Sequence, residues 1–215
     1  MRANLWLLGL NIGLLAGASF LPARWRDLAE GALLTGIFLA TLTVHGTRIW
    51  WRLAVVAGLI AAQWGTLLAG GQELAIAAGV LSGLFFLYVI SRLAVQVARA
   101  REVTRLVLLE AVNVYVLVGL VFSLLAAVIG DLWPEAYMVT ATGEPLGAGA
   151  DFHAFVYYAF ITMATVGYGD IVPVAEPARA LALLMAVTGP LYMALVIASL
   201  VGKFAASKSG SALES

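Results

Sequence analysis

The chain has 215 residues, of which 63% are apolar and only 11% are charged, and its mean hydropathy is +1.00. Soluble domains are usually about 45–50% apolar and about 25% charged, so this composition indicates a membrane protein. Twelve basic residues balance twelve acidic ones, which leaves no positive excess to bind nucleic acid, and the lack of cysteine excludes disulfides and thiolate metal sites within this chain.

Six apolar stretches are long enough to cross about 30 Å of hydrocarbon. They lie at residues 5–21, 28–47, 53–69, 74–97, 106–130 and 178–204. The first stretch has features of a signal peptide, with Arg2 before an apolar run that ends in small residues, but its length and the polar hairpin after it favour a spanning helix. We therefore predict an all-α membrane protein with six transmembrane helices.

The basic residues predict the orientation of these helices, because cytoplasmic loops of membrane proteins are enriched in lysine and arginine. With both termini in the cytoplasm, the outer side holds only Arg24, Arg26 and Arg179. The inner side then holds Arg2, Arg48, Arg52, Arg92, Arg99, Arg101, Arg105, Lys203 and Lys208. Most acidic residues fall outside, where they would attract cations.

The segment between the last two apolar stretches is unlike the other connections. Residues 131–149 are rich in Pro, Gly and Thr, which indicates an extracellular loop, whereas residues 151–165 are apolar but too short to cross the membrane. We predict a re-entrant helix that Asp151 caps at its start and that ends before the glycines at 167 and 169.

The residues after this helix, Thr165-Val166-Gly167-Tyr168-Gly169-Asp170, suit the binding of a dehydrated cation. Rings of backbone carbonyls can replace the water shell of potassium, and glycines at alternate positions allow the positive φ that aims successive carbonyls at one axis. We expect the carbonyls of residues 165–168, with the Thr165 hydroxyl below them, to form the ion sites. One chain supplies only one strand of such a cage, so the unit should be a symmetric oligomer.

The chain resembles the tetrameric potassium channel family over residues 106–204, and the run YYAFITMATVGYGDIVP at residues 157–173 carries the resemblance. The resemblance implies a homotetramer and potassium coordination along Thr165, Val166, Gly167, Tyr168 and Gly169. It also implies that the filter is supported by Asp170, Thr162, Tyr157 and Tyr158, the two tyrosines standing where the family often has tryptophans. Ile161 occupies the position of a buried glutamate found in some bacterial members, so a brace from Asp170 to that glutamate is absent.

The last apolar stretch contains Gly189-Pro190 near its middle. Proline removes one helical hydrogen bond, and the corresponding helix of the family bends to open the gate, so we expect these two residues to form a hinge or a fixed kink.

Glu110 is interpreted as a structural carboxylate paired with Arg105 or Arg101. His153 has two interpretations, an interfacial residue or a pH sensor, and the former is the commoner role.

A voltage sensor needs several arginines within the membrane, and residues 74–91 of the fourth stretch contain none. We expect a potassium-selective channel with weak or no voltage dependence, the alternatives being a voltage-gated channel and a non-conducting or transporter-associated subunit. Residues 1–100 would form a four-helix domain without sensor arginines, residues 101–206 the pore domain, and residues 207–215 a disordered tail. We expect no enzymatic activity and no cofactor. The expected partners are membrane lipids and K⁺, and the expected location is the cell membrane, as a multi-pass protein.

Overall fold

The computed structural model describes residues 2–17, 20–21, 23–44, 49–69, 71–100, 104–146 and 150–213. The helices are α1 (Arg2–Ile12), α2 (Ala23–Val44), α3 (Ile49–Ala69), α4 (Gln72–Arg99), α5 (Arg105–Leu132), α6 (Phe152–Met163) and α7 (Glu176–Leu213), and a π-helical turn, η1 (Gly13–Gly17), follows α1. The strands are β1 (Tyr137–Val139), β2 (Glu144–Pro145) and β3 (Ile171–Pro173).

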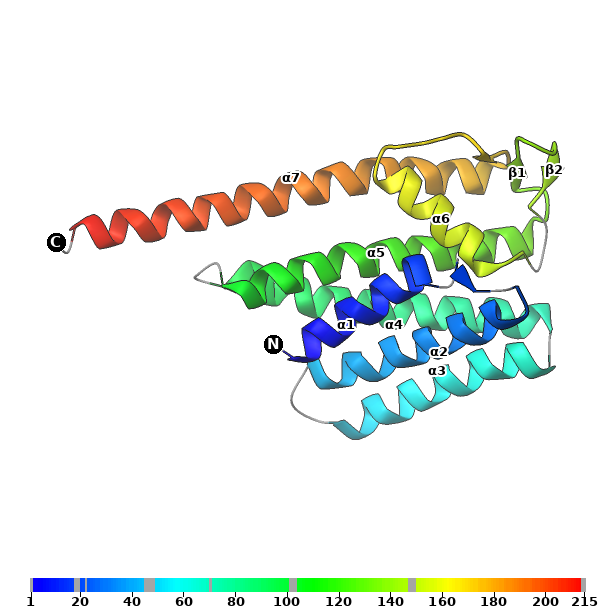
Figure 1. Ribbon diagram of the computed structural model, residues 1–215, viewed down its shortest axis with the longest axis horizontal. Coiled ribbons are helices and arrows are strands. Elements are labelled where there is room, and N and C mark those ends of the chain that lie inside the picture. Colours follow the sequence, from blue (N-terminus) through cyan, green and yellow to red (C-terminus); the bar gives the residue numbers. More distant parts are fainter. Residues whose placement is uncertain are drawn as a thin grey trace.

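The long helices lie roughly along one common axis, as Figure 1 shows, and the N- and C-termini lie at the same end of the molecule. Helix α6 and the small sheet lie at the opposite end, beside the C-terminal half of α5 and the N-terminal half of α7. A chain that crosses a membrane an even number of times must have both termini on the same side, as this arrangement does.

Four helical segments are long and apolar enough to cross a membrane, namely Arg52–Ala69, Gln72–Arg99, Arg105–Leu132 and Glu176–Ser199. They coincide with the last four of the six predicted spans. The first two predicted spans fall on the shorter apolar stretches Asn4–Leu15 and Leu28–Leu42. The described helices therefore support a membrane protein, and spanning by α1 and α2 stays a prediction.

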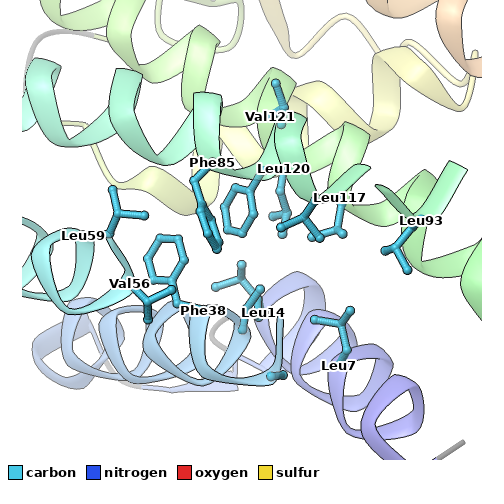
Figure 2. Packing of buried hydrophobic residues seen from close by; sticks show 14 of the residues in the cluster. Leu7, Leu14, Phe38, Val56, Leu59, Phe85, Leu93, Leu117, Leu120 and Val121 are labelled. Carbon is cyan, nitrogen blue, oxygen red and sulfur yellow. The ribbon is translucent and has the colours of Figure 1, made fainter. Parts of the chain in front are cut away.

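The main hydrophobic core joins the first four helices to α5 (Figure 2). The rings of Phe38 and Phe86 stack with centroids 5.1 Å apart, and Phe85 meets Phe38 edge-on at 5.7 Å. Leu117 and Leu120 of α5 are fully buried in the same cluster. The first four helices and the outer helix of the predicted pore domain thus share one core within this chain.

A second core surrounds α6 and holds it against α5 and α7. Its members include Ala126, Tyr137, Phe155, Tyr158, Ala159 and Met185. Two glycines of α5 allow the close approach, because a Cβ on Gly119 would lie 2.3 Å from the Phe160 ring and one on Gly130 would lie 2.7 Å from the Phe155 ring. Small residues at such contacts are typical of packed membrane helices.

The structure differs from the predicted all-α fold in the segment expected to be an irregular loop. Strand β1 pairs antiparallel with both β2 and β3, so that Val139 lies opposite Ile171, directly after the predicted filter. Helix α7 continues to Leu213, past residue 207, where the sequence had suggested a disordered tail. Pro190 lies inside this helix, which runs on without a break.

Candidate functional site

Helix α6 begins as the sequence predicted. The Asp151 side chain accepts a hydrogen bond from the backbone N–H of His153 at 3.0 Å, which is the cap expected at this position. The second carboxylate oxygen of Asp151 forms an ion pair with Arg26 of α2 at 2.8 Å. The side chain of His153 lies near α2 as well, with its Nδ1 3.8 Å from Glu30 Oε1.

The end of α6 directs the chain into the predicted filter. The amides of Val166 and Gly167 both donate to the carbonyl of Ile161, at 3.0 and 3.3 Å, and the amide of Thr165 donates to the carbonyl of Thr162 at 3.0 Å. These bonds use carbonyls that the last turn of a helix leaves without partners. They anchor the inner part of the filter segment to the C-terminal end of α6, where the helix dipole is negative.

The filter segment alternates in backbone conformation. Thr165, Gly167 and Gly169 have φ of 60°, 53° and 76°, in the left-handed region, and the residues between them do not. The predicted alternation at the two glycines is confirmed, and Thr165 extends it by one position. A threonine with positive φ is strained, and such strain is found where surrounding structure imposes it.

The carbonyls of this segment fall into two groups. Within the described residues, the carbonyls of residues 165–168 accept no hydrogen bond. The next two carbonyls, of Gly169 and Asp170, both accept from the Thr140 hydroxyl, at 2.6 and 2.9 Å, and the Thr140 amide also donates to Asp170. Four consecutive carbonyls are therefore available to a ligand, and the carbonyls that accept hydrogen bonds from Thr140 follow directly after them in the chain.

The two tyrosines that were predicted to support the filter make different contacts. Tyr157 donates a 2.6 Å hydrogen bond to Asp170, whose other carboxylate oxygen accepts from the amide of Ile171 at 3.1 Å. The hydrogen bond from Tyr157 lowers the pKa of Asp170, and the same bond raises the pKa of Tyr157 to about 12. Tyr158 is buried edge-on against Tyr137 with centroids 5.1 Å apart. Of the two predicted support tyrosines, Tyr157 contacts the filter segment directly.

The surface presented by this segment is apolar and open in the single chain. Tyr168 is 71% exposed and Val166 47% exposed. The adjoining helix α7 carries a further set of exposed apolar side chains, among them Leu183, Leu184, Val187, Leu191, Leu195, Ile197 and Val201. Contiguous apolar surface of this extent marks contact with lipid or with another protein surface.

The predicted hinge residues Gly189 and Pro190 lie in α7, and Gly189 contacts the C-terminal end of α6. A Cβ on Gly189 would lie 1.9 Å from the carbonyl oxygen of Met163, so the absence of a side chain allows α7 to touch the backbone of α6. Beside this contact an apolar groove of about 560 Å³ runs between α5 and α7 and is lined by Thr165, Pro190 and Tyr192. The contact gives Gly189 a packing role that the sequence did not reveal.

The sequence reasoning also missed Thr140 and the hydrogen bond between Asn4 and Glu110. The run Tyr137-Met-Val-Thr140, followed by a turn with a glycine at 143, carried a weak hairpin signal. Glu110 is buried and accepts a 3.3 Å hydrogen bond from Asn4 of α1. Arg105, one of its two predicted partners, is exposed, and Arg101 lies outside the described residues.

Residues 107–206 match the family model described as ion channel. The matched region contains nearly all of α5, the small sheet, α6, the filter segment and most of α7, whereas Asn4, Arg26 and Glu30 lie outside it. This part of the chain is similar to ion channel domains, and its long apolar helices indicate a membrane protein. Comparisons of the chain with curated proteins and with solved structures found no match.

Proposed function

We propose that this chain is one subunit of a homotetrameric channel that conducts K⁺ passively and selectively across the cell membrane. The proposal rests on the four carbonyls of residues 165–168, which accept no hydrogen bond within the described residues. The φ angle of the backbone alternates in sign along this segment. Carbonyl dipoles in successive rings suit potassium, because they replace its hydration shell without binding the ion as tightly as charged ligands would. Thr165, Val166, Gly167 and Tyr168 would supply the ion sites.

The same segment supports assembly into a symmetric oligomer, and the resemblance to tetrameric channels implies four subunits. A single strand of carbonyls cannot enclose an ion, and irregular backbone at membrane depth is stable only where it lines a cavity or is buried in protein. The exposed faces of Val166, Tyr168 and α7 are the surfaces that neighbouring subunits would cover in a symmetric oligomer. Both termini would lie in the cytoplasm, with the sheet and the filter entrance outside.

Voltage dependence should be weak. Within α4 the buried residues are apolar or small, and its arginines lie near the inner end. The observation that favours the voltage-gated alternative is Arg52 of α3, which is 3% exposed and donates to the carbonyl of Thr41 at 3.0 Å. One charge moving through the whole field contributes only about 2.3 kcal/mol per 100 mV, which is too little for steep gating.

The proposal is tested by measuring K⁺ and Na⁺ flux in proteoliposomes over a range of imposed voltages, with Ba²⁺ as blocker. We expect K⁺-selective, Ba²⁺-sensitive flux that changes little with voltage. Steep activation by voltage would support the alternative, and flux that requires a coupled ion gradient would indicate a transporter.

A matched pair of glycine variants links the flux to the filter. Gly167→Ala places a side chain on backbone with φ of 53° and should abolish K⁺ flux. Gly143→Ala makes the same change at φ of 70° in the turn between β1 and β2, where nothing lies within 4 Å, and should retain the flux. Normal K⁺ conduction by assembled Gly167→Ala protein would contradict the assignment of the ion sites.

A further inference from the structure

A cavity of about 390 Å³ lies apart from the filter, between α2, α3, α4, α5 and the first turn of α6. It is at the end of the molecule that carries α6 and the sheet (Figure 1). Its apolar wall includes Leu34, Phe38, Phe86 and Phe155, and the Trp64 ring lines it as well. Ligand sites in proteins are commonly cavities of about 300–1,000 Å³ with mostly apolar walls and a few polar groups, and those polar groups determine which ligand fits.

The acidic side chains in the lining already have partners in the chain. Asp151 forms its ion pair with Arg26 at 2.8 Å, and Glu30 Oε1 lies 3.8 Å from His153 Nδ1. Asp131 also interacts within the chain. The lining therefore does not call for a cationic ligand, and an uncharged ligand avoids the cost of bringing a charge into a largely apolar cavity.

The uncharged polar side chains beside Gln63 are hydrogen-bonded as well. The Trp64 indole N–H donates to the Thr35 hydroxyl at 3.0 Å, and the Thr66 hydroxyl donates to the backbone carbonyl of Gln63 at 2.7 Å. The Gln63 side-chain N–H donates to the carbonyl of Gly31 at 3.3 Å, which fixes the orientation of the amide and makes its oxygen an acceptor. This oxygen is buried and has no hydrogen-bond partner in the described part of the chain.

The Gln63 side-chain oxygen favours a ligand with a single donor on an apolar body. Leaving a buried acceptor unpaired is costly, so a donor at this point is favourable. A buried water typically makes about three hydrogen bonds, and the apolar wall around the cavity offers a water on Gln63 few further partners. A hydroxyl attached to an apolar group satisfies the oxygen and fills the remaining space with apolar contacts.

We propose that this cavity binds an uncharged alcohol with an apolar or aromatic body, whose hydroxyl donates to the side-chain oxygen of Gln63 and whose body packs against Phe38 and Phe86. Leu67 also lines the cavity and is 39% exposed on α3, so an alcohol dissolved in the membrane reaches the site from that side. A phospholipid is disfavoured, because its charged headgroup would have to leave water. Binding at this site does not depend on whether the channel conducts.

The test uses the full chain, purified in a detergent without hydroxyl groups, and isothermal titration calorimetry with 4-phenylbutanol. The methyl ether of this probe has the same apolar body but no donor, and protein-free micelles correct for partitioning into detergent. We expect saturable binding of one alcohol per chain. The ether should bind at least about fivefold more weakly, which corresponds to the loss of one net hydrogen bond.

Two variants assign the binding to the cavity. Gln63→Leu removes the acceptor, so the alcohol and the ether should bind it about equally well. Ser82→Leu places a larger apolar side chain at a position that lines the cavity and is 7% exposed, and it should weaken the binding of both probes. Gln96→Leu is the matched control, because Gln96 is an exposed glutamine of α4 that does not line the cavity, and it should keep the preference for the alcohol.

Equal binding of alcohol and ether by the unmodified chain would overturn the proposal, because the cavity would then recognise only apolarity. A preference for the alcohol that persists in Gln63→Leu would also overturn it and place the alcohol elsewhere. Thermal unfolding of each variant reports whether it is folded. If Gln63→Leu is unfolded, Ser82→Leu decides the result, and unchanged alcohol binding by that variant would contradict the assignment to the cavity.

Competition with 1,2-dioctanoylglycerol, a lipid with one free hydroxyl, distinguishes two sources of the alcohol. Displacement of 4-phenylbutanol by this lipid would support the cavity as a site for a membrane lipid alcohol. Binding of 4-phenylbutanol without displacement would support it as a site for a smaller alcohol.

Discussion

The contact between Gly189 and α6 gives the sharpest test of how the filter is positioned. In Gly189→Ala, the new Cβ would lie 1.9 Å from the Met163 carbonyl oxygen, whereas side-chain carbons essentially never approach closer than 3.0 Å. Helices α6 and α7 must therefore separate by about 1 Å or more, and overpacking of this kind typically costs about 1–3 kcal/mol. Because Met163 lies two residues before Thr165, the separation should also displace the inner end of the filter.

The measurements are thermal unfolding of the purified protein and the ratio of K⁺ to Na⁺ flux. Gly202→Ala is the control, since it lies on the exposed part of the same helix with nothing within 4 Å, and alanine should there stabilise the helix slightly. Pro190→Ala separates packing from bending, because it changes the helical hydrogen bonding and leaves the Met163 contact intact. A Gly189→Ala protein with unchanged unfolding temperature and selectivity would refute the reasoning.

Three further outcomes follow from other contacts. Tyr157→Phe should raise the pKa of Asp170, so that K⁺ flux is lost at a higher pH on acidification. In the unmodified chain the pKa of Asp170 is lowered in the folded state, so the stabilisation from this carboxylate is present above the ordinary carboxyl pKa and disappears as the pH falls through the lowered value. Identical pH profiles of flux for the variant and the unmodified chain would contradict this. Gly119→Ala should destabilise the protein in thermal unfolding, since its Cβ would meet the Phe160 ring at 2.3 Å, and Phe160→Leu should restore part of the loss; failure of that rescue would rule out the contact as the cause. Thr140→Val should cost about 0.5–1.5 kcal/mol in unfolding free energy through loss of its hydroxyl hydrogen bonds, and no change in stability would show that these bonds are replaced by water.

Features that depend on neighbouring residues in the chain could be predicted from the sequence. The cap at Asp151, the start and end of α6 and the positive φ of Gly167 and Gly169 are all encoded within a run of about twenty residues. Four of the six predicted spans also correspond to long apolar helices, because continuous hydropathy is a local signal.

Features that depend on distant partners could not be predicted. The pairing of Val139 with Ile171 joins short strands of only a few residues, whose alternation is too brief to be distinctive. Gly189 was interpreted through the proline beside it, although its role in the structure is the approach of α6. A glycine in an apolar helix shows that a close contact is possible, but the sequence does not indicate which surface makes it.

The filter segment makes few contacts of its own, so its position is determined by the helix before it and the sheet after it. Helix α6 is held at its start by the ion pair between Arg26 and Asp151, and along its side by the two glycines of α5. At its end it touches α7 at Gly189, and beyond the filter Thr140 fixes the returning backbone. The first of these contacts belongs to α2, outside the region that matches the ion channel family. Any movement of α2 relative to α5 would therefore act on the start of α6 through the ion pair between Arg26 and Asp151.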